Sequence, residues 1–412
     1  LQIGLFGRTN VGKSSFLNMI AGQDVAVTSA IPGTTTDVVE KSMELLPVGP
    51  VVFLDTAGID DESELSAARI KKTANAFDRS EVFVLVVEPS VWSDYEERIV
   101  TEAERRKSPL IIVVNKTDTA DVTESVLEKI KQKTDKFITC SSTVTGKRNA
   151  YVNEFKRVLT EAVPEELLRQ PSLVGDLVPH GGVIVLIVPI DLQAPKGRLI
   201  LPQVQTIRDA LDNDAATLVV KEREFSQVLS MLREPPKLVV CDSQIVMKMV
   251  ADTPPEVPCT TFSILFARYK GDLCDEAAGA AAIDSLGAGD KVLIAEACSH
   301  HAAEDDIGRV KIPRWLRQYA GEDLQIDICN GRDYPENLSQ YKLVIHCGAC
   351  MLTRREMLIR IQKAKEAGVA ITNYGVAISF LQGVLERVIA PFPAAMEAFH
   401  CAGKIPENNS HI

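Results

Sequence analysis

The sequence is poor in features that mark special classes of protein. Aromatic residues make up only 5% of its 412 residues, so we expect cores built from aliphatic side chains. Its apolar runs, such as residues 183–190, fall well short of the roughly 20 residues that cross a bilayer. Nine cysteines are too few for a disulfide scaffold in a chain of this length, and their number is odd. The composition therefore argues against a membrane span and predicts mostly reduced thiols.

Basic charge is also in deficit. The 45 Lys and Arg residues are outnumbered by 56 Asp and Glu residues, which gives a net charge of −11. Because nucleic-acid-binding surfaces are normally basic, this balance argues against nucleic acid as a partner and favours other proteins. No targeting segment is recognisable at the start. Residue 1 falls inside an expected strand, so we expect the natural N-terminus to lie upstream. The expected use of the cysteines as reduced thiols leads us to expect a reducing cytoplasm.

Strand-like and helix-like stretches alternate in three successive groups, which is typical of α/β domains with mostly parallel sheets. The expected strands are residues 1–6, 51–55, 82–87, 110–115, 137–140, 183–191, 217–221, 237–241, 260–264, 292–297, 324–329, 342–346 and 369–373. The expected helices are residues 13–21, 66–78, 95–107, 122–134, 202–213, 225–232, 244–250, 354–367 and 376–389. We place domains at 1–163, 183–260 and 261–412, with a Pro- and Gly-rich linker at 164–182 and a weakly patterned tail after residue 391.

A phosphate-binding loop opens the first domain. Residues 7–14 fit the pattern G-x-x-x-x-G-K-[ST] between an expected strand and an expected helix, which is the context that this motif requires. In such a loop the backbone N–H groups surround the phosphates, Lys13 reaches the β- and γ-phosphate oxygens, and Ser14 ligates Mg²⁺. The residues that we expect around the phosphates are Gly7, Thr9, Asn10, Val11, Gly12, Lys13, Ser14 and Ser15.

Two further motifs identify the nucleotide. Asp55 ends an expected strand, where its carboxylate suits the outer shell of Mg²⁺, and the Gly58 amide is placed to meet the γ-phosphate. Asn115, Lys116 and Asp118 close another strand. Asp118 can accept hydrogen bonds from N1–H and N2–H₂ of guanine, a donor pair that adenine lacks. The three motifs predict a P-loop GTPase domain that binds GTP or GDP, followed by two smaller α/β domains.

These motifs resemble the TrmE–Era group of small GTPases. The resemblance implies that residues 32–36 form switch I, where Thr35, or as a second choice Thr34, meets Mg²⁺ and the γ-phosphate. It also implies that the segment with Ser141 and Ser142 touches the base. The same resemblance implies that Asn10 helps to hold K⁺ near the phosphates. The alternative that Asn10 simply forms a turn remains open.

The residue after Gly58 bears on the rate of hydrolysis. Ras-like enzymes use a glutamine there to orient the attacking water, whereas this chain has Ile59. We therefore expect slow GTP hydrolysis, helped by K⁺ or by partner contacts. The residues expected at the reacting phosphate are Lys13, Thr35, Asp55 and Gly58.

A second group of chemically active residues lies in the third domain. Cys298 and His300 follow one expected strand, and His346, Cys347 and Cys350 follow another. Open α/β sheets bind ligands at the carboxyl ends of their strands. The set suits either tetrahedral zinc or a 4Fe–4S cluster, and the residues alone leave both open. In a cluster, the fourth iron would be held weakly by a histidine, by a carboxylate from residues 304–306, or by an outside ligand.

The G domain, the small middle domain and the CxH and HCxxC groups together resemble the HydF family of FeFe-hydrogenase maturation GTPases. The stretches 266–273, 312–315 and 371–375 agree as well, so the resemblance covers nearly the whole chain. It implies that Cys298, Cys347 and Cys350 hold a 4Fe–4S cluster, with His300 and His346 at or near it.

The same resemblance implies a homodimer formed by the middle domain and a role as scaffold or carrier. Such a protein receives a diiron subcluster precursor made with radical-SAM maturases and delivers it to apo FeFe-hydrogenase.

Two competing functions stay open. One is a zinc-containing GTPase switch, which metal content would distinguish. The other is an RNA- or ribosome-directed GTPase of the TrmE–Era type, against which the charge and the lack of a recognisable GXXG RNA-binding loop argue. The remaining cysteines are expected to pack in cores: Cys140, Cys241, Cys259, Cys274, Cys329 and Cys401.

Overall fold

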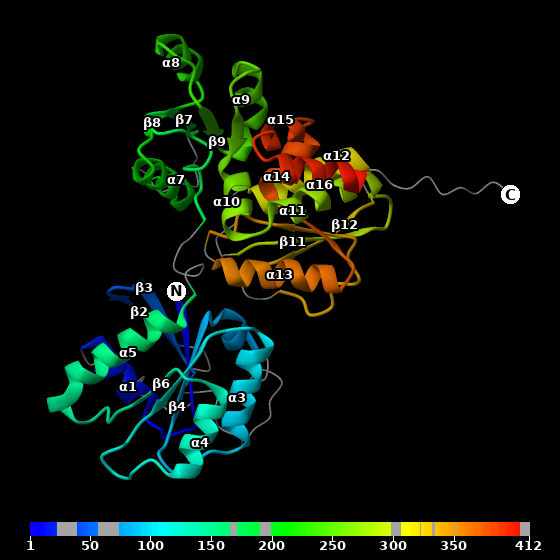
Figure 1. Cartoon of the computed structure of the whole chain (residues 1–412). Coiled ribbons are helices and arrows are strands. Elements are labelled where there is room, and N and C mark those ends of the chain that lie inside the picture. The colour runs from blue at the N-terminus through cyan, green and yellow to red at the C-terminus, as the bar shows by residue number, and fades with distance from the viewer. Residues whose placement is uncertain are drawn as a thin grey trace. The chain divides into compact units, whose positions relative to one another are not determined.

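The computed structural model describes residues 1–22, 39–56, 74–164, 171–189, 199–297, 306–321, 323–331, 334–350 and 352–403. The chain divides into two compact units, residues 1–170 and 171–412. Both are α/β in construction with mostly parallel sheets, so the predicted fold class is confirmed (Figure 1).

The first unit is built on a six-stranded sheet with the strand order β2-β3-β1-β4-β5-β6. Its strands are β1 (Gln2–Phe6), β2 (Val39–Leu45), β3 (Gly49–Asp55), β4 (Val82–Val87), β5 (Leu110–Val114) and β6 (Phe137–Thr139). All neighbouring pairs are parallel except β2 and β3, which are antiparallel. The sequence does not predict β2, because this edge strand consists mainly of charged and polar residues with only two strongly apolar positions after its first residue.

Helices cover both faces of this sheet. Apolar residues of α1 (Lys13–Ala21) and α5 (Arg148–Ala162) pack on one face, and those of α3 (Asp94–Arg105) and α4 (Glu124–Lys133) pack on the other. α3 begins with a capping box in which Ser93 and Glu96 bond each other's backbone N–H groups. This arrangement leaves the carboxyl ends of β1, β3, β5 and β6 at one edge, where the nucleotide motifs lie.

The second unit contains two four-stranded parallel sheets with the same topology. Their strand orders are β10-β9-β7-β8 and β12-β11-β13-β14. The strands are β7 (Val183–Ile187), β8 (Ala216–Val220), β9 (Leu238–Cys241), β10 (Cys259–Thr261), β11 (Lys291–Ala295), β12 (Gln325–Cys329), β13 (Leu343–His346) and β14 (Ala370–Asn373). In each sheet the chain reverses its direction of winding between the first and third strands. At such a switch point open α/β sheets bind ligands.

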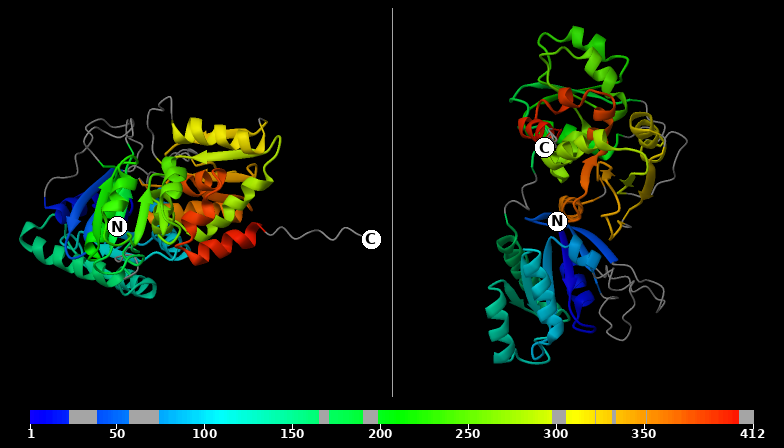
Figure 2. Two further views of the ribbon diagram at one scale, coloured as in Figure 1. Left: turned by 90° about the horizontal axis from the view of Figure 1, so that it is seen from above. Right: turned by 90° about the vertical axis from the view of Figure 1, so that its right-hand side faces the viewer.

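Helices again cover the sheets of the second unit. They are α7 (Leu201–Asp212), α8 (Phe225–Met231), α9 (Val246–Asp252), α10 (Phe262–Lys270), α11 (Leu273–Ala280), α12 (Ile312–Ala320), α13 (Arg354–Glu366), α14 (Tyr374–Leu381), α15 (Leu385–Ile389) and α16 (Pro393–Gly403). α13 covers one face of the β11–β14 sheet, and α11, α12 and α14 cover the other (Figure 1, Figure 2). Within the described residues, no helix combines the length and the apolar composition that a membrane crossing needs.

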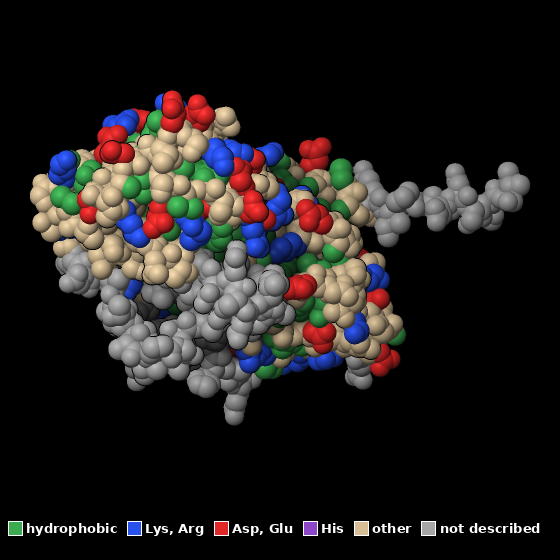
Figure 3. Space-filling view, turned by 90° about the horizontal axis from the view of Figure 1, so that it is seen from below, with side chains coloured by type: hydrophobic (Ala, Val, Ile, Leu, Met, Phe, Trp, Pro, Cys, Tyr) green, Lys and Arg blue, Asp and Glu red, His purple; other side chains and the backbone are tan. Residues whose placement is uncertain are grey.

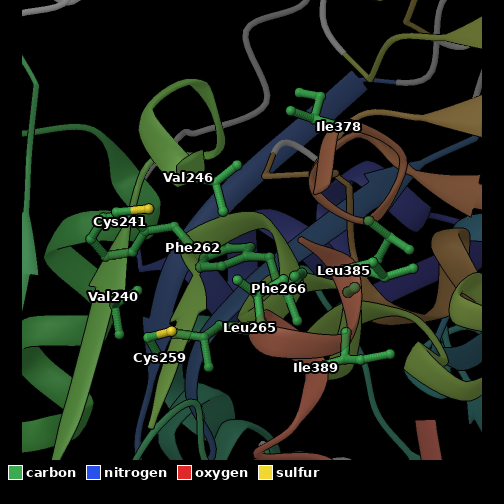
Figure 4. Close-up of a cluster of buried hydrophobic side chains, with 14 of the residues drawn as sticks. Val240, Cys241, Val246, Cys259, Phe262, Leu265, Phe266, Ile378, Leu385 and Ile389 are labelled. Carbon is green, nitrogen blue, oxygen red and sulfur yellow. The ribbon is translucent and has the colours of Figure 1, made fainter. Parts of the chain in front are cut away.

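One hydrophobic core extends across both sheets of the second unit. Cys241 and Cys259 from the first sheet and Phe266 from α10 pack in the same cluster as Ile378 and Leu385 from the C-terminal helices (Figure 4). Three apolar residues of the predicted linker, Leu173, Val174 and Val178, are also buried in this cluster. The division of residues 171–412 into two domains therefore stays a prediction, and part of the expected linker is core.

Three expectations for the second unit are corrected. The expected strand 260–264 ends at Thr261, because Thr261 caps α10 by accepting a hydrogen bond from the Ile264 N–H. The expected helix 376–389 is two helices, α14 and α15, separated where Gly383 has a φ of +71°. The weakly patterned tail contains α16, on which Cys401 is exposed rather than packed in a core.

A buried carboxyl in α11 gives the second unit a testable pH dependence. Glu276 is 1% exposed, and neither side-chain oxygen has a hydrogen-bond partner within the described structure. Burial, with smaller contributions from Asp272 and Asp275, raises the pKa of Glu276 from 4.5 to about 8. The folded state thus keeps a proton that the unfolded state loses. We expect the free energy of unfolding to fall by about 4 kcal/mol as pH rises from about 4.5 to about 8.

Urea unfolding at a series of pH values measures this dependence. The chain has two tryptophans, so Trp315 reports on the second unit in a Trp92→Phe background. Glu276→Gln cannot titrate and is expected to flatten the pH dependence between these limits. Glu386→Gln is a matched control, because the Glu386 side chain is exposed. An equal pH slope in all three proteins would contradict the assignment.

Candidate nucleotide and metal sites

The loop after β1 adopts the geometry of a phosphate-binding loop. Lys13 is 5% exposed, and its Nζ donates hydrogen bonds to the carbonyl oxygens of Gly7 and, at 3.0 Å, of Arg8. The ammonium group is thereby held across the loop. Asn10 has a left-handed backbone with a φ of +67°, which agrees with a turn-forming role. Thr9, Asn10 and Ser15 are exposed, and a role for Asn10 in binding K⁺ stays a prediction.

Gly12 allows this loop to dock against the base-binding motif. A Cβ atom at Gly12 would lie 2.3 Å from Asn115 Nδ2, and Gly12 has a φ of +95°. The Asn115 side chain occupies the space beside Gly12, and its Nδ2 donates a 3.0 Å hydrogen bond to the Val11 carbonyl oxygen. Asn115 Oδ1 accepts from the backbone N–H and the hydroxyl of Ser142 at 3.0 and 2.9 Å. A single buried side chain thus fixes the phosphate loop and the segment after β6 together.

The carboxylate predicted to bind guanine is held by a neighbouring serine. Ser141 Oγ donates a 2.5 Å hydrogen bond to Asp118 Oδ1, and the Asp118 side chain is otherwise exposed. Oδ2 has no hydrogen-bond partner within the described structure, which leaves it available to a base. The structure therefore brings Ser141, Ser142 and Asp118 together at one edge, as the sequence predicts.

The Mg²⁺ ligands are placed only in part. Ser14 Oγ lies 3.5 Å from Asp55 Oδ2, so the hydroxyl and the carboxylate face one another from α1 and β3. An oxygen pair of this kind is what Mg²⁺ binds in phosphate sites. Thr34, Thr35, Gly58 and Ile59 lie outside the described residues, so their roles stay predictions.

An ionic network beside the phosphate loop is not predicted from the sequence. Arg8 Nε donates a 2.8 Å hydrogen bond to Glu96, whose side chain is fully buried, and Gly7 N–H donates to Tyr95 Oη at 3.4 Å. Glu88 lies 2.6 Å from Lys116 Nζ. No local sequence pattern reveals these contacts, because the partners are separated by 28 to 88 positions.

Three of the predicted metal ligands, His346, Cys347 and Cys350, lie at or just after the carboxyl end of β13, at the switch point of the second sheet of this unit. β11 and β13 are neighbours, with Ala295 opposite His346. Beyond the strands, the Ala297 N–H donates a 3.0 Å hydrogen bond to Cys347 Sγ. Cys298 and His300 lie outside the described residues. Within the described structure alone, no group of three or more potential ligands forms a metal site.

The turn that carries Cys350 is held by two cations. Lys270 Nζ donates to the carbonyl oxygens of Ala349, Cys350 and Leu352 at 3.2, 2.9 and 2.6 Å. In return, Arg354 Nη1 donates to the carbonyl oxygens of residues 268, 269 and 271 at the end of α10. Burial lowers the pKa of Lys270, while the Cys350 thiol opposes that shift. The α10 end and the cysteine turn therefore hold each other in place.

His346 is fully buried, and both of its ring nitrogens are occupied. Nδ1 lies 2.8 Å from the Cys347 carbonyl oxygen and Nε2 lies 2.8 Å from Arg360 Nη1. Arg360 also donates to the Gly331 carbonyl oxygen and lies over the Tyr334 ring at 4.8 Å. Burial, and secondarily the Arg360 charge, lower the pKa of His346 to about 3, so the imidazole is neutral.

Since Arg360 is a donor, Nε2 of His346 accepts and Nδ1–H donates to Cys347. This arrangement leaves neither nitrogen for a metal. The structure thus places His346 beside the predicted site as a support for Cys347, and a ligand role stays a prediction.

Acidic and basic residues near the site are mostly paired. Arg309 donates to Glu296 Oε2 at 3.1 Å and to Asn330 Oδ1 at 3.0 Å, and Lys311 donates to Gln244 at 2.7 Å. Asp306 is buried and accepts from the Arg309 backbone N–H. Of the six cysteines expected in cores, Cys140, Cys241 and Cys259 are buried, whereas Cys274 and Cys329 are half-buried.

The fold and motifs of the first unit define a P-loop GTPase domain, and family comparison agrees. Residues 2–116 match the family described as 50S ribosome-binding GTPase. Residues 173–271 match the hydrogen maturase F dimerization domain, and residues 275–391 match the hydrogen maturase F tetramerization domain. The two hydrogen maturase F domains together cover most of the second unit. The chain belongs to the hydrogen maturase F family.

Curated relatives match the GTPase part. A tRNA modification GTPase MnmE from Synechococcus sp. (strain JA-3-3Ab) is 42% identical over 125 residues, 29% of this chain and 26% of that protein. The GTPase Der of Kosmotoga olearia is 34% identical over 124 residues, 29% of this chain and 28% of that protein. The chain thus spans little more than a quarter of the length of these relatives.

Among solved structures, Aquifex aeolicus Era bound to GDP and AlF₄⁻ is similar at 16% identity. The match covers 53% of this chain and 93% of that one, with a TM-score of 0.33. A likeness at this TM-score is too weak to support an inference.

Proposed function

We propose that this protein is a GTP-hydrolysing scaffold that carries a diiron subcluster to FeFe-hydrogenase and holds a 4Fe–4S cluster through Cys298, Cys347 and Cys350. The single observation that carries the proposal is the convergence, in a chain of the hydrogen maturase F family, of the β11 and β13 ends on one edge with a thiol hydrogen bond between them. The radical-SAM maturases and apo-hydrogenase are its proposed partners, and the cytoplasm is its proposed location.

The donor set fits an iron–sulfur cluster. Cys347 and Cys350 flank a turn in which Ala349 has a left-handed backbone with a φ of +52°, and the turn precedes α13. Backbone N–H groups directed at the sulfurs, such as that of Ala297, stabilise cluster thiolates and tune the reduction potential. Lys270 adds a positive charge beside the same turn. With three thiolates bound, the cluster supplies an iron whose remaining ligand exchanges, and such an iron suits a carrier.

The proposed GTPase reaction depends on positioning. Lys13 contacts the β- and γ-phosphates in place of the carbonyl oxygens that it now bonds, and Ser14 binds Mg²⁺ with Asp55 in the outer shell. Thr35 and Gly58 complete the γ-phosphate site. Because Ile59 cannot orient water, turnover is slow, and K⁺ near Asn10 is the proposed stimulating ion.

Self-association is proposed through the region that matches the dimerization domain. β8 is an edge strand, and Leu218 and Val219 on it are 37% and 45% exposed. Val204 and Leu211 on α7 are similarly exposed. Apolar side chains at an unpaired strand edge favour association with a second chain. On the face shown in Figure 3, basic and acidic side chains of the described residues are interspersed, which supports proteins rather than nucleic acid as further partners.

Metal analysis of anaerobically purified and reconstituted protein tests the proposal. We expect about four iron and four sulfide per chain, brown colour, and an electron paramagnetic resonance signal after reduction. GTP hydrolysis is measured on the same sample in K⁺ and in Na⁺, with faster turnover expected in K⁺. Stoichiometric zinc without iron would overturn the cluster assignment and identify a zinc-containing GTPase switch instead.

A further inference from the structure

A tyrosine hydroxyl lies at the same edge as the proposed cluster ligands. Tyr374 is the first residue of α14 and directly follows β14, whose last residue, Asn373, is opposite His346 of β13. Tyr374 therefore emerges from the strand next to the one that carries Cys347. The neighbouring loop on the other side begins at Glu296 and leads to Cys298.

The Tyr374 hydroxyl is buried and without a partner. Its oxygen has no hydrogen bond in the described structure. The Cys347 thiol and the Glu296 carboxylate lie close enough to act on this hydroxyl electrostatically. A neutral phenol has one O–H donor, so the hydroxyl is available to donate a hydrogen bond. A buried donor left unpaired is unfavourable, so native structures rarely retain one without an unseen partner.

The surroundings make room for this hydroxyl. A Cβ atom at Gly308 would lie 2.1 Å from Tyr374 Oη and 2.8 Å from Glu296 Oε1, so only glycine admits the phenol at this position. Gly308 lies in a π-helical turn, residues Ile307–Lys311, a rare element that is frequent at functional sites.

The neighbouring Glu296 carboxylate does not satisfy this hydroxyl. Glu296 Oε2 is bonded to Arg309 at 3.1 Å, and Tyr374 forms no hydrogen bond to the carboxylate despite lying beside it. The Cys347 sulfur accepts from the Ala297 N–H. Within the part of the chain that the structure describes, the hydroxyl thus makes no hydrogen bond, although it lies near Cys347, a proposed cluster ligand.

We infer that Tyr374 donates a hydrogen bond to the iron–sulfur group proposed at Cys347 and Cys350, either to a sulfur or to an exchangeable anionic ligand on it. Tyr374 is then a positioning residue that stabilises the reduced cluster. The inference rests on the proposed function and adds a specific residue to it.

Tyr374→Phe tests the inference with a minimal change in shape. We expect the variant to take up as much iron and sulfide as the wild-type protein. Because a hydrogen bond to cluster sulfur or to an anionic ligand favours the reduced state, its reduction potential should be more negative, and the resonance spectrum of its reduced cluster should differ.

Thermal unfolding is an independent test, because Tyr374→Phe should change the melting temperature differently in the metal-free and the loaded protein. In the metal-free protein, Tyr374→Phe removes an unpaired hydroxyl, so the melting temperature should be unchanged or higher. In the loaded protein it removes a hydrogen bond, so the melting temperature should be lower. Tyr341→Phe is the matched control: its Oη already donates to Asp327 Oδ2 at 3.0 Å, so its loss should lower the melting temperature equally in both forms and leave the potential unchanged.

The outcomes separate the two proposals. Normal iron uptake with an unchanged potential and spectrum overturns the role of Tyr374 alone. The same is true if Tyr374→Phe destabilises the empty and loaded forms equally, since the partner would then be water or protein. Failure of the wild-type protein to take up iron overturns the proposed function and the inference together.

Discussion

Replacing Cys347 or Cys350 by alanine is expected to reduce cluster affinity by more than about 100-fold, because even outer-shell partners of metal ligands are worth about 10–100-fold. The two thiols flank one turn, and no other described cysteine lies in that turn to substitute for either. Cys298→Ala should have the same effect if the third thiol is supplied by the loop after β11. Iron and sulfide analysis after anaerobic reconstitution measures the loss.

Two control variants sharpen this experiment. Cys401→Ala removes an exposed thiol on α16 and should retain full iron. His346→Gln should also retain iron, because both imidazole nitrogens are bonded to Arg360 and Cys347 rather than directed at a metal. Undiminished iron in all three cysteine variants would disprove the assignment, and loss of iron in the His346 variant would restore the histidine as a ligand.

Asp118→Asn is expected to weaken GTP binding by about 100-fold, which corresponds to about 3 kcal/mol for the charged hydrogen bonds that are lost. The guanine N2–H₂ group would then face an amide donor. Xanthine carries a carbonyl at that position, so xanthosine triphosphate should bind the variant better than GTP does. Ser141 can still donate to the side-chain oxygen of the asparagine, so the loop geometry should be kept.

Nucleotide titrations with both triphosphates measure this change in preference. Asp121→Asn removes the same charge from an exposed position three residues away and should leave both affinities unaltered. Unchanged GTP affinity in Asp118→Asn would mean that the base is not read by this carboxylate.

Much of the nucleotide site is predictable because its residues are close in sequence and end strands. Lys13 and Asp118 follow parallel strands of one sheet, and parallel strands bring their carboxyl ends to a common edge. The ionic contacts of Arg8 and Glu88 escape prediction, since they depend on long-range packing. β2 is not predicted for another reason. An exposed edge strand has too few apolar residues to show the alternating pattern that identifies a strand.

For the proposed metal site, the sequence indicates the candidate thiols but not the side chains that support them. The CxxC spacing reveals Cys347 and Cys350 directly, whereas no motif indicates that Lys270 and Arg360 lie beside them. His346 shows the limit of residue type as a guide. Its place next to Cys347 suggests a ligand, yet burial against Arg360 on α13 occupies the nitrogen that a metal would need.

Lys270 and Arg354 couple the position of the cysteine turn to the position of the end of α10. Lys270 reaches from α10 to the turn, and Arg354 reaches from the start of α13 back to the end of α10. A shift of α10 along its axis must therefore either move the turn as well or break both sets of hydrogen bonds. α10 falls within the region that matches the dimerization domain, whereas the turn falls within the next one. The end of the region that matches the dimerization domain is therefore linked to the turn proposed to hold the cluster through six carbonyl oxygens and two side chains.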